Sequence, residues 1–143
     1  MELFDLEDMF GRRKKPKLTL EATFIHNRCE ILIGLRNEGR GTAKAPYLSF
    51  SIPAPFSLAL YGIDGNGSTG LPRLHHGGND SQHPRFGANS DVVIHPNTTH
   101  DIIKIEFRGR DENRPEGEFV IEHEIAAEDV QLVRSRVAVM VRR

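Results

Sequence analysis

Histidines and aspartates gather in one polar, glycine-rich part of the chain, and both residue types can act as metal ligands. The histidines are His75, His76, His83, His95 and His100, and the aspartates are Asp80, Asp91 and Asp101. Imidazole and carboxylate groups bind zinc, so a metal-dependent hydrolase is one alternative function. Their spacing matches no metal motif such as His-Glu-x-x-His. We therefore favour a polar surface loop, and we expect neither a metal nor another cofactor.

The stretch Asp64-Gly-Asn-Gly-Ser-Thr-Gly70 begins like a calcium-binding loop. Asp64, Asn66 and Ser68 alternate as the first ligands of such a loop do. The sixth position is Thr69, where the loop needs glycine, and the twelfth is His75, where it needs glutamate. A tight glycine turn explains the stretch better.

Nucleophilic catalysis has little support in the sequence. No Gly-x-Ser-x-Gly elbow occurs, and no base or helix start adjoins Cys29, which we expect to be a small buried residue within a strand. His123 alternates with apolar residues, which predicts a partly buried histidine with its hydrogen bonds satisfied. Three carboxylates have strand spacing and lie beside charged loops, so we expect them on solvated faces: Glu118, Glu122 and Glu124. The sequence therefore predicts a protein that is not an enzyme.

A basic run lies near the N-terminus and could contact phosphates. It consists of Arg12, Arg13, Lys14 and Lys15, with Lys17 after Pro16. No aromatic residues are interleaved with these charges, so a solvated linker explains them better. The whole chain has a net charge of −1, which implies no general attraction to nucleic acid or to an anionic membrane. A nucleic-acid-associated module that uses residues 12–15 is the first alternative function.

Composition and periodicity predict the secondary-structure elements that carry these residues. The chain has 143 residues, 38% of them hydrophobic and 27% charged, enough for one globular domain with its own core. Alternating apolar and polar side chains recur in short runs at 18–24, 31–35, 47–52, 56–60, 92–94, 103–107, 119–125 and 133–141. Turn signals separate the runs, and we expect one helical turn at 126–130. This pattern predicts an all-β, immunoglobulin-like antiparallel sandwich of about seven or eight strands.

The two ends of the chain differ in character. Apolar residues within 1–10 lie near helical spacing, and Gly11 and Pro16 interrupt any helix, so 1–16 is predicted to be a short helix and a basic linker. Residues 17–143 are predicted to form the sandwich, with one long Gly/His-rich loop at 62–90. The single cysteine fits a reducing compartment, and no stretch has the length of a membrane helix or a secretory signal. We expect a cytoplasmic location and no membrane partner.

Two resemblances extend this interpretation. The run from Ile31 to Pro53 resembles immunoglobulin-like sandwiches of the bacterial adhesion-related type. In its turn, Asn37-Glu-Gly-Arg-Gly41, glycines can take a positive φ, while Ala43 and Ala45 let the crossing strand lie close. Residues 8–18, the same turn, and Tyr61-Gly-x-Asp-Gly-Asn-Gly67 together resemble the β-rich C-terminal region of bacterial proteins with an AlbA- or Schlafen-type N-terminal domain, a group linked to DNA binding.

The resemblance implies an accessory domain of a larger bacterial protein and assigns no functional residue to this chain. Together with the missing catalytic motifs, it predicts a non-catalytic protein-interaction domain. The expected partner is another protein or an upstream domain of the same protein, and nucleic acid is the alternative.

Overall fold

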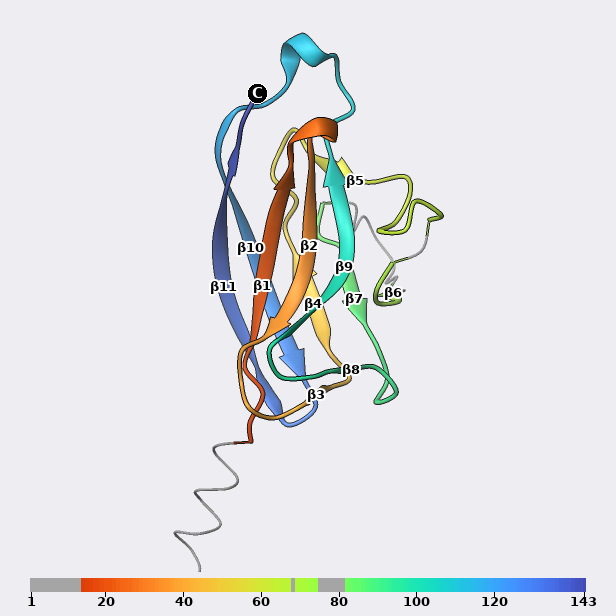
Figure 1. Ribbon diagram of the computed structural model, residues 1–143, viewed down its shortest axis with the longest axis vertical. Helices are drawn as coiled ribbons and strands as arrows, with labels where there is room; N and C mark the ends of the chain where they lie inside the picture. The colour runs from red at the N-terminus through yellow and green to blue at the C-terminus, as the bar shows by residue number, and fades with distance from the viewer. Residues whose placement is uncertain (1–13, 68, 75–81) are drawn as a thin grey trace, which may run out of the picture.

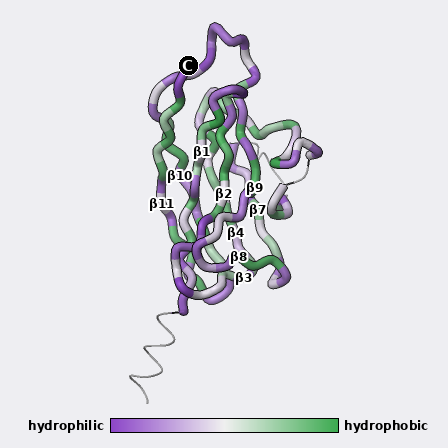
Figure 2. The backbone as a smooth tube through the Cα atoms, in the orientation of Figure 1, coloured by the Kyte–Doolittle hydropathy of each residue, from purple (hydrophilic) through white to green (hydrophobic). Residues whose placement is uncertain are grey.

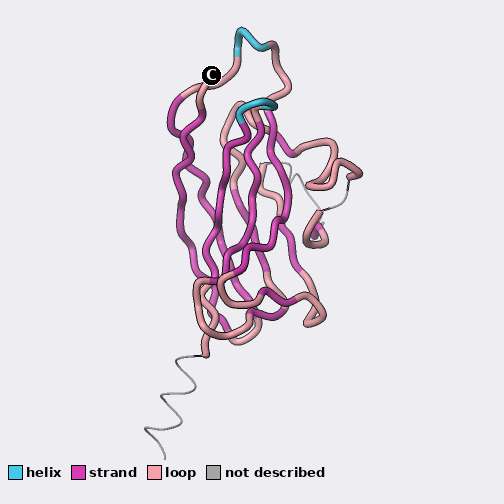
Figure 3. Tube along the Cα trace, viewed as in Figure 1, coloured by secondary structure: helices cyan, strands magenta, loops and turns pink. Residues whose placement is uncertain are grey.

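The described chain is all-β. The computed structural model describes residues 14–67, 69–74 and 82–143. Within them, eleven strands and two short 3-10 helices follow one another (Figures 1 and 3). The strands are β1 (Leu18–Ile25), β2 (Glu30–Asn37), β3 (Ala43–Lys44), β4 (Tyr47–Phe50), β5 (Ser57–Leu58), β6 (Arg73–Leu74), β7 (Arg85–Gly87), β8 (Val93–Ile94), β9 (Thr98–Glu106), β10 (Gly117–Ala127) and β11 (Val130–Val141). The helices are η1 (His26–Arg28) and η2 (Asp111–Asn113), and neither is long and apolar enough to cross a membrane.

Two antiparallel sheets form the body of the molecule. One has the order β1-β2-β9-β5 and the other has the order β11-β10-β4-β7-β6, while β3 and β8 pair at one end (Figure 1). The register of β1 on β2 places Leu20 opposite Leu35, and β10 pairs with β11 along almost its whole length, with Ile121 opposite Val137. As a result, β1 and β11 are the edge strands on the same side of the sandwich, and they contact each other across the two layers.

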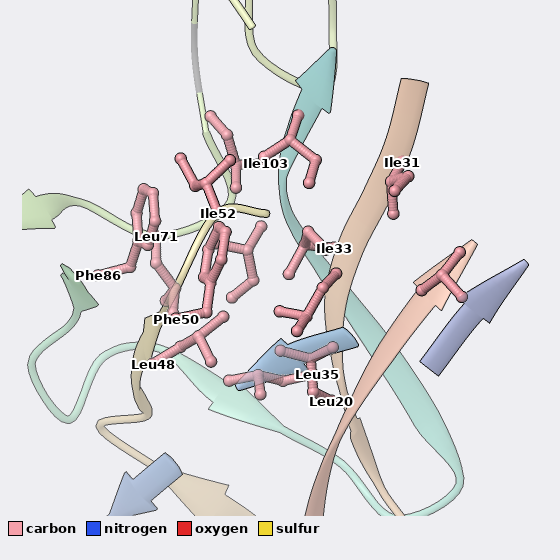
Figure 4. Packing of buried hydrophobic residues seen from close by; sticks show 14 of the residues in the cluster. Leu20, Ile31, Ile33, Leu35, Leu48, Phe50, Ile52, Leu71, Phe86 and Ile103 are labelled. Atoms are coloured by element: carbon pink, nitrogen blue, oxygen red, sulfur yellow. The ribbon is translucent and has the colours of Figure 1, made fainter. Parts of the chain in front are cut away.

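The core lies between the two sheets. Side chains that alternate along β2, β4 and β9 point inward and meet there (Figure 4), and hydrophobic colours concentrate along the strands while the connecting loops are more polar (Figure 2). Ile33 and Phe50 are almost fully buried, and the rings of Phe50 and Phe86 stack with centroids 6.1 Å apart. Burial of these apolar side chains is the main favourable term in folding, so the predicted alternation is confirmed as the source of the fold.

A buried asparagine ties the lower end of the sandwich together. The Asn37 side chain is fully buried; its Nδ2 donates to the carbonyls of Gly41 (2.7 Å) and Ile94 (2.9 Å). Its Oδ1 accepts from the backbone amides of Gly39 (2.9 Å) and Lys17 (3.1 Å). One side chain thus joins the start of β1, the turn after β2 and strand β8. A buried amide needs such partners, because losing them costs desolvation energy.

The glycines of this turn serve close approach of the backbone, not a positive φ as the sequence suggested. Neither has a φ in the left-handed region. A Cβ at Gly41 would lie 1.4 Å from the carbonyl oxygen of Lys14, and one at Gly39 would lie 2.3 Å from that of Lys15. The amides of Arg40 and Gly41 both donate to the Lys15 carbonyl. Residues 14–17 are therefore packed directly on the turn.

The structure has more strands than the seven or eight expected. Three strands were not predicted, and each spans only two or three residues, a length at which alternation is hard to detect: β3, β6 and β7. Two others, β5 and β8, lie within the predicted runs at 56–60 and 92–94 but are only two residues long. Within the predicted loop at 62–90, β6 and β7 pair with each other and extend the edge of the five-stranded sheet. The predicted loop thus contains two short strands.

Two local predictions were wrong. No helical turn forms at 126–130, because β10 continues to Ala127 and β11 begins at Val130; the two-residue turn between them places Asp129 at φ 61°. Cys29 is buried as predicted, with 3% of its surface exposed, but it caps η1 in the left-handed conformation and does not lie within a strand. The short helix predicted within residues 1–10 lies outside the described residues.

Candidate binding surface along strand β11

Strand β11 forms one edge of the five-stranded sheet. Among the described residues, only β10 pairs with it, so its other edge offers backbone amides and carbonyls along a strand of twelve residues. Three large apolar side chains on β11 are exposed, at 44% for Leu132, 57% for Val133 and 51% for Met140. Long edge strands with exposed apolar side chains are sites at which another polypeptide can pair.

The outer face of the β10–β11 ribbon combines apolar and charged side chains. Met140 lies opposite Glu118, and Val120 of β10, 43% exposed, lies opposite Ala138. Further along the ribbon the charges alternate in sign across the strands, since Arg136 lies opposite Glu122, and Arg134 pairs with Glu124 at 3.1 Å. The β11 strand itself is basic, and its arginines would oppose pairing with a second β11 strand by like-charge repulsion.

The inner face of β11 lines a groove of about 510 Å³ between the two sheets. Its apolar walls are formed by Leu18 and Leu20 of β1, Ile125 of β10, and Val133 and Val137 of β11. We call this the edge groove. In the second half of β11 the inward side chains Val139 and Val141 are buried in the core, whereas the inward Val133 is 57% exposed. At this end of the sandwich, therefore, the described residues leave part of the space between the sheets unfilled.

A buried histidine lies in the edge groove. His123 is 7% exposed, and its Nδ1 lies 3.1 Å from the carbonyl oxygen of Ile121. Burial away from water lowers the pKa of His123 below its ordinary value of 6.5, while the hydrogen bond to Ile121 opposes that shift. The neutral imidazole is the favoured form. The prediction of a buried histidine is confirmed, and its Nδ1 has a hydrogen-bond partner.

The rim of the edge groove is basic. Lys17 and Arg136 both line it, and neither forms an ion pair with any described residue. Both side chains are exposed, so each alone contributes little through solvent-screened attraction. Together they give the groove a positive rim around an apolar floor, which suits a ligand that combines apolar and acidic groups.

A second, polar cleft of about 630 Å³ lies on the outer face of β4, β10 and β11. In it, the Ser51 hydroxyl lies 3.0 Å from Nδ1 of His83. A serine nucleophile needs a base that is itself oriented by a third group, and none bonds to the other ring nitrogen of His83 among the described residues. The pair therefore has the chemistry of two surface side chains.

The predicted phosphate-contacting residues are only partly described. Arg12 and Arg13 lie outside the described residues, whereas Lys14 and Lys15 are exposed and line a cleft of about 290 Å³. Lys44 lines the same cleft, but so do Glu128 and Asp129, which makes its charge mixed. No feature of this cleft favours a nucleic-acid backbone over solvent.

The histidines of the polar region do not converge in the described part of the chain. Nε2 of His100 lies 2.6 Å from the Gly70 carbonyl, His83 contacts Ser51, and the exposed His95 has its carbonyl bonded to Thr98. No group of three or more possible metal ligands is found among the described residues. His75, His76 and Asp80 lie outside them.

The glycine-rich stretch forms turns, as predicted. The amide of Asn66 donates to the Asp64 carboxylate at 2.9 Å, and Gly65 and Gly67 have φ of 79° and 85°. Residues 65–70 also fit the pattern Gly-x-Gly-x-x-Gly, which the sequence reasoning missed. Nucleotide binding by that pattern needs a helix N-terminus directly after it, and strand β6 follows instead.

Sequence reasoning also missed the edge groove and the exposed faces of β11. The alternation of residues 133–141 predicted the strand, but nothing in the sequence shows which strand is an edge. A signal was present in the first half of β11, where Gln131, Arg134, Ser135 and Arg136 interrupt the apolar pattern. In comparisons with known proteins, no family model and no curated sequence matches the chain.

Proposed function

We propose that the chain is a non-catalytic protein-interaction domain, with an immunoglobulin-like sandwich, that binds an extended polypeptide segment along β11. One observation carries this proposal: a twelve-residue edge strand with an unpaired outer edge presents large apolar side chains to solvent. A peptide added there gains backbone hydrogen bonds from the edge and specificity from alternating side chains. The resemblance to C-terminal regions of AlbA- or Schlafen-type bacterial proteins agrees with an accessory role.

The surface favours a partner segment that alternates apolar and acidic residues. Leu132 and Met140 offer apolar contacts on this face. An added strand would lie beside β11 and not beside β10, so it would meet Arg134 and Arg136 before the β10 glutamates opposite them, Glu124 and Glu122. Because the charges lie at the solvent-exposed face, they contribute to selectivity and association rate more than to affinity. The partner is another protein or an upstream domain of the same protein.

Selection from a library of displayed random peptides against the full chain tests the proposal. We expect enrichment of extended peptides that combine acidic and apolar residues. Met140→Glu removes an apolar contact and adds repulsion, and it should weaken binding of an enriched peptide by about tenfold, the equivalent of about 1.4 kcal/mol.

Tyr61→Glu is the matched control, because Tyr61 is also a large, exposed side chain (63%) but lies in the loop after β5. Its effect should be negligible. Lack of any enriched peptide, or equal weakening by both variants, would refute binding along β11.

Two alternatives give different results. Nucleic-acid association through Arg12, Arg13, Lys14 and Lys15 predicts salt-dependent DNA or RNA binding that is lost when these four residues become alanine. Metal-dependent hydrolysis by the loop histidines predicts stoichiometric metal in the purified protein.

A further inference from the structure

The edge groove lies beside the point at which the N-terminal segment joins the domain. Pro16 and Lys17 line the groove, and residues 14–17 are held on the turn after β2 by backbone hydrogen bonds: the Glu38 amide donates to the Lys17 carbonyl at 2.8 Å, and the Arg40 amide to that of Lys15 at 3.1 Å. The direction of the chain is thus fixed at the mouth of the groove. Any segment that precedes residue 14 starts within reach of it.

The composition of residues 1–10 matches the groove in both polarity and charge. They carry six large apolar side chains and four carboxylates: Met1, Leu3, Phe4, Leu6, Met9 and Phe10, and Glu2, Asp5, Glu7 and Asp8. The groove has an apolar floor and the two cationic rim residues Lys17 and Arg136. Contact between the apolar side chains of the segment and the apolar floor of the groove removes both surfaces from water, which is favourable.

The dimensions agree as well. The groove follows β11 from Val130 to Val137, roughly 23 Å at the rise of a strand. Ten residues span at most about 35 Å, and Gly11 can supply the reversal between the segment and residues 14–17. Because the segment is tethered at the groove, its effective concentration there reaches the millimolar range, so modest contacts suffice for occupancy.

We propose that residues 1–10 dock in the edge groove of their own chain and fill the space between β1 and β11. Val133, Leu18 and Leu20 contact the apolar side chains of the segment, and Lys17 and Arg136 face its carboxylates. The segment before the sandwich is then part of the domain and not a free tether. This inference concerns the inner face of β11 and does not require partner binding at the outer face; Arg136 is a residue that both sites share, since it lines the edge groove and the outer cleft.

Paramagnetic NMR on the full chain tests the docking. A spin label is attached to the thiol of Glu2→Cys, and the buried Cys29 is left in place. We expect broadening of amide signals at 17–20 and 130–137 and none at η2, which lies at the opposite end of the sandwich (Figure 1). Broadening that is absent from the groove would overturn the proposal.

Adjacent residues of β11 supply a matched pair of variants. Val133→Glu places a carboxylate on the groove wall and should abolish the broadening, whereas Leu132→Glu changes the neighbouring residue on the outer face and should leave it intact. Both side chains are already substantially exposed, so neither change should unfold the domain. Equal loss in both variants would contradict docking in the groove.

A mixed sample identifies the source of the segment. Isotope-labelled protein without a spin label is combined with unlabelled, spin-labelled protein. Docking within one chain predicts no broadening in this mixture, and groove-specific broadening would show that a second copy supplies the segment, which would overturn the proposal. Because Met140→Glu acts on peptide binding and Val133→Glu acts on docking, failure of one hypothesis is distinguishable from failure of the other.

Discussion

Replacing Asn37 with alanine should destabilise the domain strongly. The side chain makes four hydrogen bonds in a fully buried position, two as donor and two as acceptor. Each bond contributes about 1 kcal/mol net, so their joint loss should cost about 4 kcal/mol. Typical domains have only 5–15 kcal/mol of stability, which makes this a large fraction.

Urea denaturation followed by circular dichroism measures the change in the free energy of unfolding. Asn37→Asp keeps the acceptors but places an ionised oxygen against the carbonyls of Gly41 and Ile94, so it should be at least as destabilising at neutral pH. Acid should partly rescue it, because a protonated carboxyl can donate one hydrogen bond. Asn89→Ala, at an exposed position, is the control and should change stability by less than about 0.5 kcal/mol. A loss below about 1 kcal/mol for Asn37→Ala would refute the account of this end of the sandwich.

The remaining predictions concern packing and pH. Gly41→Ala places a Cβ against the Lys14 carbonyl, so residues 14–17 must shift. Amide hydrogen exchange at these residues should therefore accelerate. Unchanged exchange would contradict the close approach of the two backbones. Phe86→Ala empties a fully buried site in contact with Phe50 and should cost about 3–5 kcal/mol in urea denaturation. The fold favours neutral His123, because burial lowers its pKa below the unfolded value of 6.5. The free energy of unfolding should therefore fall as pH decreases below about 6.5, and His123→Gln should reduce this pH dependence. An unchanged pH profile in the variant would contradict the prediction.

The sequence predicted the main strands because their cause is local. Leu18, Leu20, Ile31 and Ile33 alternate with residues that face away from the core, and the pleat of a strand turns this alternation directly into one buried face. The buried His123 was predicted for the same reason. The short strands β3, β6 and β7 were not predicted, because pairing of such short segments is decided by neighbours far away in the sequence.

The binding surface along β11 could not be predicted from periodicity, because periodicity does not show which strand lies at the edge of a sheet. The alternation at 133–141 predicted a strand, but whether Val133 is covered depends on how the opposite sheet packs against it. The Asn37 turn is similar: its residue types indicated a reversal, yet the reason for Gly41 is the passing backbone of Lys14. Tertiary contacts of this kind involve segments that are distant in the sequence, so a single sequence shows the residue types but not the contacts that require them.

Amide hydrogen exchange along β11 gives a direct test of peptide binding at this strand. It compares the full chain alone with the full chain saturated by a peptide enriched in the selection. Strand addition predicts that amides of Val130–Val141 at the unpaired edge exchange rapidly without peptide and become protected when it binds, while β5 and β6 stay unchanged. Protection elsewhere without any change in β11 would contradict binding along this strand.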